Sequence, residues 1–427
     1  MGRETSRRTG GNPGVRVMSR AAAAPPAVTD FEALHLQVAD EGPDWIREFR
    51  RESRARFAVE GLPHHRMEAW RHTNLAPIIA GRFVPASCSP KISGGGEGIW
   101  TGHLSEAPQE ILVLVRKHFG SLADSEGHPF TALNGSLLNE ITLVVLPEGS
   151  AAGGPVTIRH TAGRGQSLNV PRTLVLAGDR AEGTIIETYE GTETAGGYFT
   201  SAVTEILCGR ETDIKYCRIQ REAPGSYHVG RVQARVEEGG KLHSAEITLG
   251  AALDRVDAGV TLGGEGASCE MDGLFLTDGV RHVDNRTRIE HAVPNCRSRQ
   301  VYKGILSGRS TAVFVGRVVV KPGAQATDAD QSNPNLLLSD DATIYTRPQL
   351  EIYADDVRCT HGATVGQLDE DALFYLRSRG IDPDEAGRLL VKGFAGEILD
   401  RIEVPSLRTQ LESEVAGKLP VTAGTEG

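Results

Sequence analysis

The stretches TAVF at residues 311–314 and ATIY at residues 342–345 each join a turn of small or acidic residues to a short strand of alternating apolar side chains. The same pattern occurs as GTII at 183–186, TDIK at 212–215 and GKLH at 240–243. It recurs roughly every 25–30 residues, a period typical of stacked repeat coils. Gly, Pro and Asp bound further expected strands at 111–115, 141–146, 156–158 and 174–176.

The order of these strands limits the fold class. No helical pattern of ~10–15 residues interrupts them, which argues against a doubly wound sheet of alternating strands and helices. A β-sandwich and an edge-stacked β-helix both remain, and the repeat spacing favours the β-helix. We therefore expect a mainly β protein with a parallel β-helix core. Such a stack leaves open strand edges at both ends, which the terminal helices are expected to cover.

Helical signals precede the strands. TDFE at residues 29–32 has the form of a capping box, and Pro43 and Asp44 introduce a helix that Gly61 can stop.

Helical signals also follow the strands. Asp369 can cap a helix over 372–379, Asp382 precedes a second helix, and Ser406 can cap a third. The second helix carries an apolar stripe at helical spacing, made of Ala386, Leu389, Leu390, Phe394, Ile398 and Ile402. This stripe either packs against the chain's own core or forms a groove for a partner protein.

These patterns divide the chain into four parts: a disordered tail (1–30), an N-terminal helical domain (31–105), a β-helix core (106–350) and a C-terminal helical domain (351–427). The arginines and small residues of the tail are faintly similar to an organelle transit peptide. A disordered bacterial extension, or a true start at Met18, is the favoured interpretation.

Composition excludes several classes of protein. A net charge of -10 and the lack of a basic run argue against nucleic-acid binding. No apolar run approaches the ~18 residues of a membrane helix, so a soluble protein without a membrane partner is expected. The six cysteines form no C-x-x-C pair and are interpreted as reduced cytosolic thiols. A cytoplasmic location is expected, and the plastid stroma is less favoured because the tail is only faintly similar to a transit peptide.

Known catalytic and nucleotide-binding motifs are absent from the sequence. It contains no G-x-x-x-x-G-K-[ST] loop and no G-x-G-x-x-G after a strand. It also lacks H-E-x-x-H and G-x-S-x-G. We therefore expect no catalytic residue and no bound nucleotide, so that any ATP hydrolysis belongs to another protein.

One short segment combines two soft metal ligands. Cys359 and His361 are two residues apart where the strands give way to helices, and Asp355 and Asp356 precede them. A thiol and an imidazole flanked by carboxylates suit a transition metal or sulfide. The alternative is an ordinary loop with a buried cysteine and a satisfied histidine, because C-x-H alone is a weak signal.

A second polar cluster lies in HVDNRTRIEH at residues 282–291. In an extended strand His282, Asp284 and Glu290 share one face with the arginines, whereas His291 points away. A polar ladder along one face is therefore favoured over a site.

Four segments carry a resemblance to a known family: MEAWRHTNL (67–75), HVDNRTRIEH (282–291), YKGILSGRSTAVFVGRVVV (302–320) and the long stretch 327–381. With these motifs the chain resembles the SufB/SufD family, the scaffold subunits of the Suf system for iron–sulfur cluster assembly. The close match covers the C-terminal third. Two features favour the SufD branch. SufB-like chains have H-E-A where this chain has His361-Gly362-Ala363, and this chain has no cysteine between Cys296 and Cys359.

The resemblance implies a right-handed parallel β-helix and two partners: a SufB-like paralogue bound through the β-helices, and a SufC-like ATPase bound through the C-terminal helices. Their expected docking residues are Phe374, Leu389, Leu390, Phe394 and Ile398. It also implies a transient iron–sulfur cluster, or its iron, at the heterodimer interface.

The family's interface histidine corresponds by motif to His361, which would ligate the nascent cluster. Cys359 would ligate it as a thiolate or be structural, and the sulfur-accepting cysteine would come from the partner. Asp355 and Asp356 would steer iron or hydrogen-bond the histidine.

Two rival functions remain. A β-helix enzyme acting on polysaccharide would gather carboxylates along an exposed groove, yet the acidic residues here lie mostly at turns. A purely structural family member would differ only in whether the Cys359–His361 segment is exposed at a subunit interface.

Overall fold

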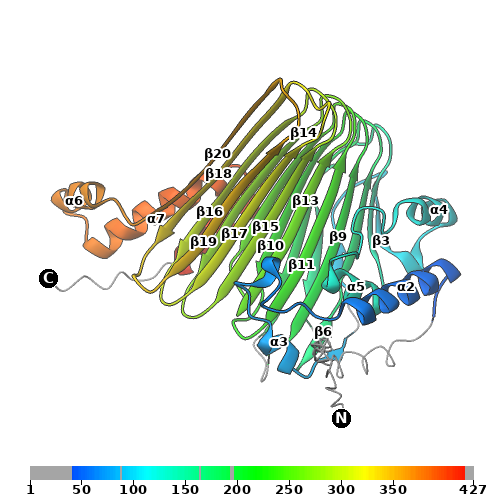
Figure 1. Ribbon diagram of the computed structural model, residues 1–427, viewed down its shortest axis with the longest axis horizontal. Coiled ribbons are helices and arrows are strands. Elements are labelled where there is room, and N and C mark those ends of the chain that lie inside the picture. Colours follow the sequence, from blue (N-terminus) through cyan, green and yellow to red (C-terminus); the bar gives the residue numbers. More distant parts are fainter. Residues whose placement is uncertain (1–40, 87–88, 163–164, 193–196, 419–427) are drawn as a thin grey trace, which may run out of the picture.

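The computed structural model describes residues 41–86, 89–162, 165–192 and 197–418. Figure 1 shows a stack of long strands with helices at both ends. The expected tail, Met18 and the capping box at 29–32 lie outside the described residues. Among the described helices, none is both long and apolar enough to cross a membrane.

The strands form two sheets. The first sheet has eleven strands: β1 (Val84–Pro85), β3 (Trp100–His103), β4 (Thr142–Leu146), β6 (Ser167–Asn169), β7 (Arg172–Ala177), β9 (Phe199–Cys208), β11 (Tyr227–Val236), β13 (Leu253–Leu262), β15 (His282–His291), β17 (Thr311–Val320) and β19 (Thr343–Ile352). The second has nine: β2 (Lys91–Ser93), β5 (Val156–Thr161), β8 (Glu182–Glu190), β10 (Asp213–Arg221), β12 (Lys241–Thr248), β14 (Ser268–Thr277), β16 (Arg297–Leu306), β18 (Thr327–Leu337) and β20 (Val357–Gly366).

The chain alternates between the two sheets. Along the first sheet the order runs from β19 through β17 and β15 down to β4, and along the second from β20 through β18 and β16 down to β5. Successive strands within each of these runs pair in parallel, so each coil lies directly on the one before it. The result is a parallel β-helix of about eight turns, which confirms the expected fold class.

A recurring turn explains the sequence period. Before successive strands of the second sheet, one residue per coil adopts a left-handed conformation, as at Arg180 (φ 57°), Glu211 (φ 55°), Asn295 (φ 61°) and Ala326 (φ 56°). Its backbone N–H donates to a carbonyl of the next coil, for example from Ala326 to Asp356 at 2.7 Å. Gly239 takes the same position before β12, and glycine adopts a positive φ without strain because it has no Cβ.

Alternating side chains of both sheets fill the inside of the β-helix, here called the lumen. Its apolar part includes Ile185, Val256, Ile289 and Val318, all almost fully buried. A period of two places these residues on the inner face and their neighbours outside. Burial of apolar area along the whole stack is the main stabilising contribution, because each coil covers the next.

Polar groups also occupy the lumen, and each carboxylate there is surrounded by donors. Glu187 accepts from Thr173 (2.6 Å) and Tyr216 (2.6 Å) and contacts the His160 ring at 2.8 Å. Burial raises the pKa of Glu187, but the hydrogen bond and charge of His160 outweigh burial and lower it to about 2.

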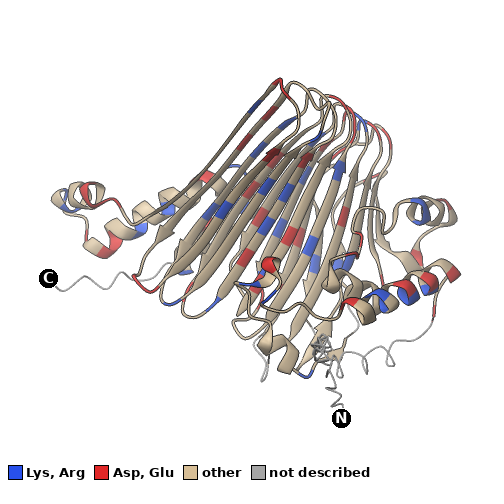
Figure 2. Ribbon diagram, in the orientation of Figure 1, with Lys and Arg blue, Asp and Glu red and all other residues tan. Residues whose placement is uncertain are grey.

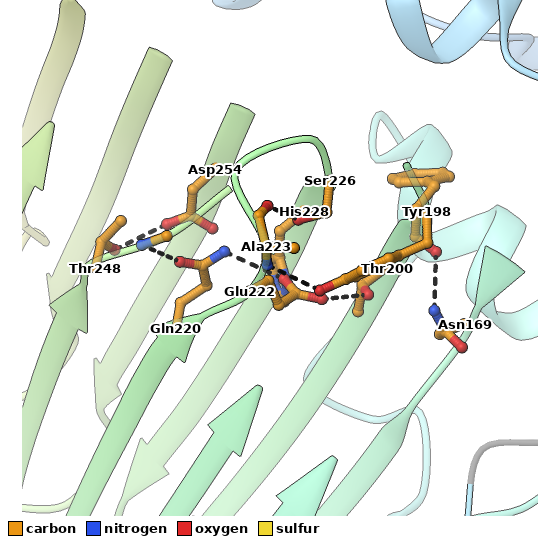
Figure 3. Close-up of polar contacts among 12 residues, drawn as sticks. Asn169, Tyr198, Thr200, Gln220, Glu222, Ala223, Ser226, His228, Thr248 and Asp254 are labelled. Carbon is orange, nitrogen blue, oxygen red and sulfur yellow. Dashed lines mark hydrogen bonds and ion pairs between the residues drawn. The ribbon is translucent and has the colours of Figure 1, made fainter. Parts of the chain in front are cut away.

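A second buried network lies where β10 and β11 are joined, shown in Figure 3. Glu222 accepts from Thr200 (2.6 Å) and Gln220 (3.2 Å) and contacts the His228 ring at 2.7 Å. The side-chain carbonyl oxygen of Gln220 in turn accepts a hydrogen bond from the backbone N–H of Gly250 at 3.0 Å. Such networks satisfy polar groups that burial would otherwise leave without partners.

The N-terminal helices cover the outer face of the first sheet. They are α2 (Asp44–Glu60), η1 (Glu68–Trp70), α3 (Ala76–Ala80), η2 (Leu104–Glu106), α4 (Gln109–His118) and α5 (Pro129–Ser136). Gly61 ends α2 with a φ of 64°, as expected. The strand expected at 111–115 is wrong, because these residues form part of α4. A short apolar run fits a buried helix as well as a strand, and its length cannot distinguish them.

A buried ion pair fastens this helical layer to the first sheet. Glu205 on β9 accepts from the backbone N–H groups of Gly120 (3.1 Å), Leu122 (3.1 Å) and Ala123 (3.2 Å), just after α4. The Arg172 guanidinium donates to the same carboxylate at 2.6 Å. Four hydrogen-bond donors therefore take the place of water around the Glu205 carboxylate, and they connect the loop after α4 to β7 and β9.

The C-terminal helices are α6 (Glu370–Ser378), α7 (Pro383–Leu399) and α8 (Pro405–Lys418). Asp369 caps α6 as expected, accepting from Asp371 N at 2.9 Å and Ala372 N at 3.1 Å. The expected cap at Ser406 is wrong, since α8 begins at Pro405 and Ser406 therefore lies inside its first turn. α7 and α8 pack on the outer face of the second sheet, against residues such as Ile219 and Leu274.

The expectation that terminal helices cover both ends of the β-helix is wrong. At the N-terminal end β2 and β3 pair antiparallel with β5 and β4. At the C-terminal end β19 and β20 are the last strands of their sheets, and α7 and α8 lie on the side of the stack instead. The strands also extend to Gly366, so the expected domain boundary at 351 falls before the last strand.

Candidate functional site: the open end of the β-helix

The Cys359–His361 segment is part of β20 and not a loop. β20 pairs on one side with β18, and among the described residues no strand pairs with its other side. Its burial pattern is almost wholly exposed from Thr360 to Gly366. An exposed edge of this length offers a row of free backbone N–H and C=O groups to another chain.

Cys359 and His361 share the face of β20 that continues the lumen. In the register with β18, Cys359 lies beside Ala329 and His361 beside Gln331, and both of these β18 residues are buried. Val357 and Cys359 pack against the lumen core, and His361 follows on the same side but is exposed. The predicted pair of soft ligands is therefore brought to one face at the open end.

The Cys359 thiol is half-buried. Burial and, to a lesser degree, the Asp328 carboxylate raise its pKa above the ordinary thiol value. The thiolate expected from sequence is therefore disfavoured in this chain alone, because both causes favour the neutral thiol. Binding of a metal would have to displace that proton.

A ladder of buried amides leads from the lumen to His361. Gln331 donates from Nε2 to Oε1 of Gln300 at 2.5 Å, and its own Oε1 has no hydrogen-bond partner among the described residues. Gly316 makes room for this amide, since a Cβ there would lie 2.3 Å from Gln331 Nε2. Sequence reasoning missed the ladder, although Gln300, Gln331 and His361 follow each other at the spacing of one coil.

Asp355 and Asp356 lie in the turn before β20 and are exposed. The Asp356 backbone N–H donates to Gln325 at 2.8 Å. An extended strand rises about 3.3 Å per residue, so His361 lies roughly 13 Å beyond Val357 at the strand's start. The expected hydrogen bond from Asp356 to His361 is therefore not available within this chain.

The polar cluster at 282–291 forms β15, with the alternation expected from its sequence. Asp284 lies on the outer face and binds Thr73 (2.5 Å) and Arg255 (2.5 Å) under the N-terminal layer. His291 points into the lumen, where its ring contacts Ser298 Oγ at 2.8 Å. The two histidines do not converge, and the ladder interpretation is confirmed.

The expected docking residues divide into two groups. Phe374 on α6 and Leu389 on α7 are 72% and 42% exposed. Leu390 and Phe394 are partly buried, and the Phe394 ring holds the Lys303 ammonium 4.3 Å from its centroid. Ile398 is fully buried against the second sheet, so it stabilises the packing of α7 and offers no surface to a partner.

One further cluster has metal-ligating groups, formed by His243, Glu270 and Asp272. Asp272 is buried, its Oδ2 contacts His243 Nε2 at 2.9 Å, and its Oδ1 pairs with Arg401 before α8. The carboxylate is thus already neutralised by a guanidinium, and the cluster joins the second sheet to the C-terminal helices.

Comparison with known proteins gives a consistent result. The family model described as "SUF system FeS cluster assembly, SufBD core domain" matches residues 159–394. The chain is 31% identical over 397 residues to an iron–sulfur cluster assembly SufBD family protein of Synechocystis, covering 83% of this chain and 87% of the relative. It is 30% identical over 381 residues to the iron–sulfur cluster assembly protein SufD of Escherichia coli, covering 84% and 90%. A SufBD family protein of Mycobacterium tuberculosis is 30% identical over 385 residues, covering 87% and 94%.

Proposed function

The chain belongs to the SufBD family and takes part in iron–sulfur cluster assembly, and from this premise we propose that it is a non-catalytic, SufD-type scaffold subunit. In this role it pairs with a SufB-like paralogue and binds a SufC-like ATPase. It works in the cytoplasm, and it holds a nascent cluster, or iron for it, only transiently.

The observation that carries the proposal is the open end of the β-helix. In the part of the chain that the structure describes, β19 and β20 each have one unpaired strand edge. The exposed apolar side chains on or beside these edges are Tyr345, Ile352, Tyr353 and Val365. A long edge with apolar side chains is a template for pairing with another chain. A second β-helix that continued the stack would satisfy these backbone groups.

Such pairing would place His361 at the junction of two β-helices. Its imidazole would then supply a nitrogen ligand on the lumen side of the interface. Cys359, one step deeper, is held as a neutral thiol by burial and would ligate only after losing its proton.

The exposed part of the C-terminal helices supports the ATPase contact. Phe374, Tyr375 and Leu389 form an apolar surface on α6 and α7 that the β-helix does not cover. Phe374, Leu389, Leu390 and Phe394 remain in the proposed docking surface, and Ile398 does not.

The polysaccharide-acting enzyme is the weaker alternative. The buried carboxylates of the described residues, including Glu187, Glu205 and Asp284, are bound by donors of this chain and do not gather along an open groove. This arrangement is unlike the pair of free carboxylates that glycoside hydrolysis needs.

The test is anaerobic co-expression with SufB-like and SufC-like partners, followed by measurement of iron and sulfide per purified complex. We expect His361→Ala to leave the complex assembled but to lose most of its iron and sulfide. Thr364→Ala, an exposed substitution on the same strand, is the matched control and should retain both.

Three results would change the proposal. Unchanged iron in the His361→Ala complex would remove the histidine from the site. Loss of iron in Cys359→Ser as well would add the thiol as a ligand. Failure of the wild-type chain to form any complex would overturn the scaffold assignment.

A further inference from the structure

A cavity of about 210 Å³ lies between the first sheet and the N-terminal helical layer, far along the stack from His361. Its floor is the outer face of β11, β13 and β15, with Arg231, Arg255, Asp257 and Arg286. Its walls come from η1 and the start of α5, including Trp70. Figure 2 shows the alternation of positive and negative residues across these strands.

The charges around this cavity do not balance. Arg231, Asp257 and Arg286 are direct neighbours in the register of three strands. Asp257, however, pairs with Arg255 at 3.2 Å, and Arg286 pairs with Asp284 at 3.0 Å. Arg255 also reaches Asp284, at 2.5 Å. Arg255 and Arg286 therefore share the carboxylates of Asp257 and Asp284.

Arg231 is the cation left over. Among the described residues its guanidinium donates only to the backbone carbonyl of Asp124, and its Nε has no partner. No carboxylate of the described residues lies within ion-pair distance of it. Burial lowers the pKa of Arg231 to about 10, although the more distant carboxylates of Asp257 and Asp124 act in the opposite direction.

The rest of the lining suits a negative group. The N-terminal residues of α5, from Pro129 to Thr131, face the cavity, and a helix N-terminus favours an anion. His128 adds no charge at neutral pH, because burial lowers its pKa to about 4. The Trp70 ring is already stacked on Arg255, with 3.6 Å between the guanidinium carbon and the ring centroid, so this arginine is fixed in place.

The size of the cavity limits the ligand. Drug-sized molecules occupy about 300–1,000 Å³, so about 210 Å³ fits a smaller species. A guanidinium forms paired hydrogen bonds to the oxygens of phosphate or carboxylate groups. We propose that this cavity is a binding site for a small oxyanion, a phosphate- or carboxylate-bearing molecule, held by Arg231 and Arg286.

The experiment is calorimetric titration of the full chain with inorganic phosphate and, separately, with acetate, at an ionic strength kept constant with chloride. We expect saturable binding of one anion per chain. The tighter of the two anions identifies the class of ligand. In Arg231→Gln and Arg286→Gln the binding should weaken at least tenfold, which is about 1.4 kcal/mol.

Arg288→Gln is the matched control. Arg288 lies on the same outer face of β15 and pairs with Glu290, so its replacement makes the same change in net charge away from the cavity. We expect this variant to bind like the wild type. Equal weakening in Arg288→Gln would indicate a general charge effect and overturn the site.

A second measurement separates binding from structural support. Because Arg231 lacks a carboxylate partner, Arg231→Gln should unfold at the same or a higher temperature than the wild type in buffer without oxyanion. The wild type, but not the variant, should gain thermal stability when phosphate or acetate is added. A large loss of stability in Arg231→Gln, or no saturable binding by the wild type, would overturn the proposal.

Discussion

The two ends of the β-helix solve the problem of exposed strand edges differently. At the N-terminal end β2 and β3 turn antiparallel, and helices cover the neighbouring face of the first sheet. At the C-terminal end β19 and β20 each pair on one side only, as far as the described residues show, while α7 and α8 pack on the side of the stack. Among the described residues one end is closed by antiparallel strands of the chain itself, whereas the other end leaves strand edges exposed, and the candidate ligands Cys359 and His361 lie at this exposed end.

The largest expected difference between the two ends is in the stability of the chain. Trp70 is buried against Phe130 and Arg255, so Trp70→Ala should lower the free energy of unfolding by about 3–5 kcal/mol. Tyr353→Ala, in an exposed position beside the open end, should change it by less than about 0.5 kcal/mol. Urea denaturation measures both variants. Similar losses would mean that the open end contributes to the core as much as the closed end.

The buried lumen and the exposed open end should also differ in how they respond to acid. Burial lowers the pKa of His291 in the lumen to about 4, against about 6.5 in the unfolded chain. As pH falls from 6.5 to 4, the unfolded chain binds a proton that the folded chain does not. Stability attributable to this group therefore falls by about 3 kcal/mol over that window.

His291→Gln should flatten this part of the stability curve. Thr287→Val, at a neighbouring lumen position of β15, is the control that does not titrate and should leave the slope unchanged. Chemical denaturation at a series of pH values between 7 and 4 measures the slope. An unaltered slope in His291→Gln would show that the acid sensitivity of the fold arises elsewhere.

The smallest expected effect concerns association of the isolated chain. An unpaired edge strand should allow weak self-association, and a lysine on the edge should oppose it. We expect Val365→Lys to weaken self-association about tenfold, or about 1.4 kcal/mol, with little change in stability. Val113→Lys, at a position on α4 that is at least as exposed, should have no such effect. Sedimentation velocity over a concentration series would detect the difference, and equal behaviour of the two variants would contradict the edge mechanism.

Much of the fold follows from local pattern. The recurring turn-and-strand unit predicted the stacked coils, and Asp369 and Gly61 marked helix ends correctly. The misassigned segment at 111–115 has no periodicity that separates a strand from a helix. The side on which α7 packs depends on contacts with Ile219 and Leu274, far away in sequence, so its apolar stripe alone could not locate it.

The sequence suggested the candidate ligands but did not show the strand in which they lie. Cys359 and His361 were identified from their chemistry, yet their place in a strand required the register with Ala329 and Gln331. The raised pKa of Cys359 comes from burial and from Asp328, neither of which local sequence shows. Arg231 was overlooked because its significance lies in the carboxylate partner that it lacks, and only the assembled strands show this.

The left-handed turn that recurs before strands of the second sheet has a consequence for how this molecule can vary in length. Because every coil repeats the same turn and adds one strand to each sheet, whole coils are interchangeable modules. Gain or loss of one coil would move the open end by one strand spacing, about 4.8 Å, without rebuilding either terminus. The separation between the cavity beside Arg231 and the exposed edge of β20 is thus adjustable only in discrete steps, and a relative with one coil more would hold these two places one step further apart.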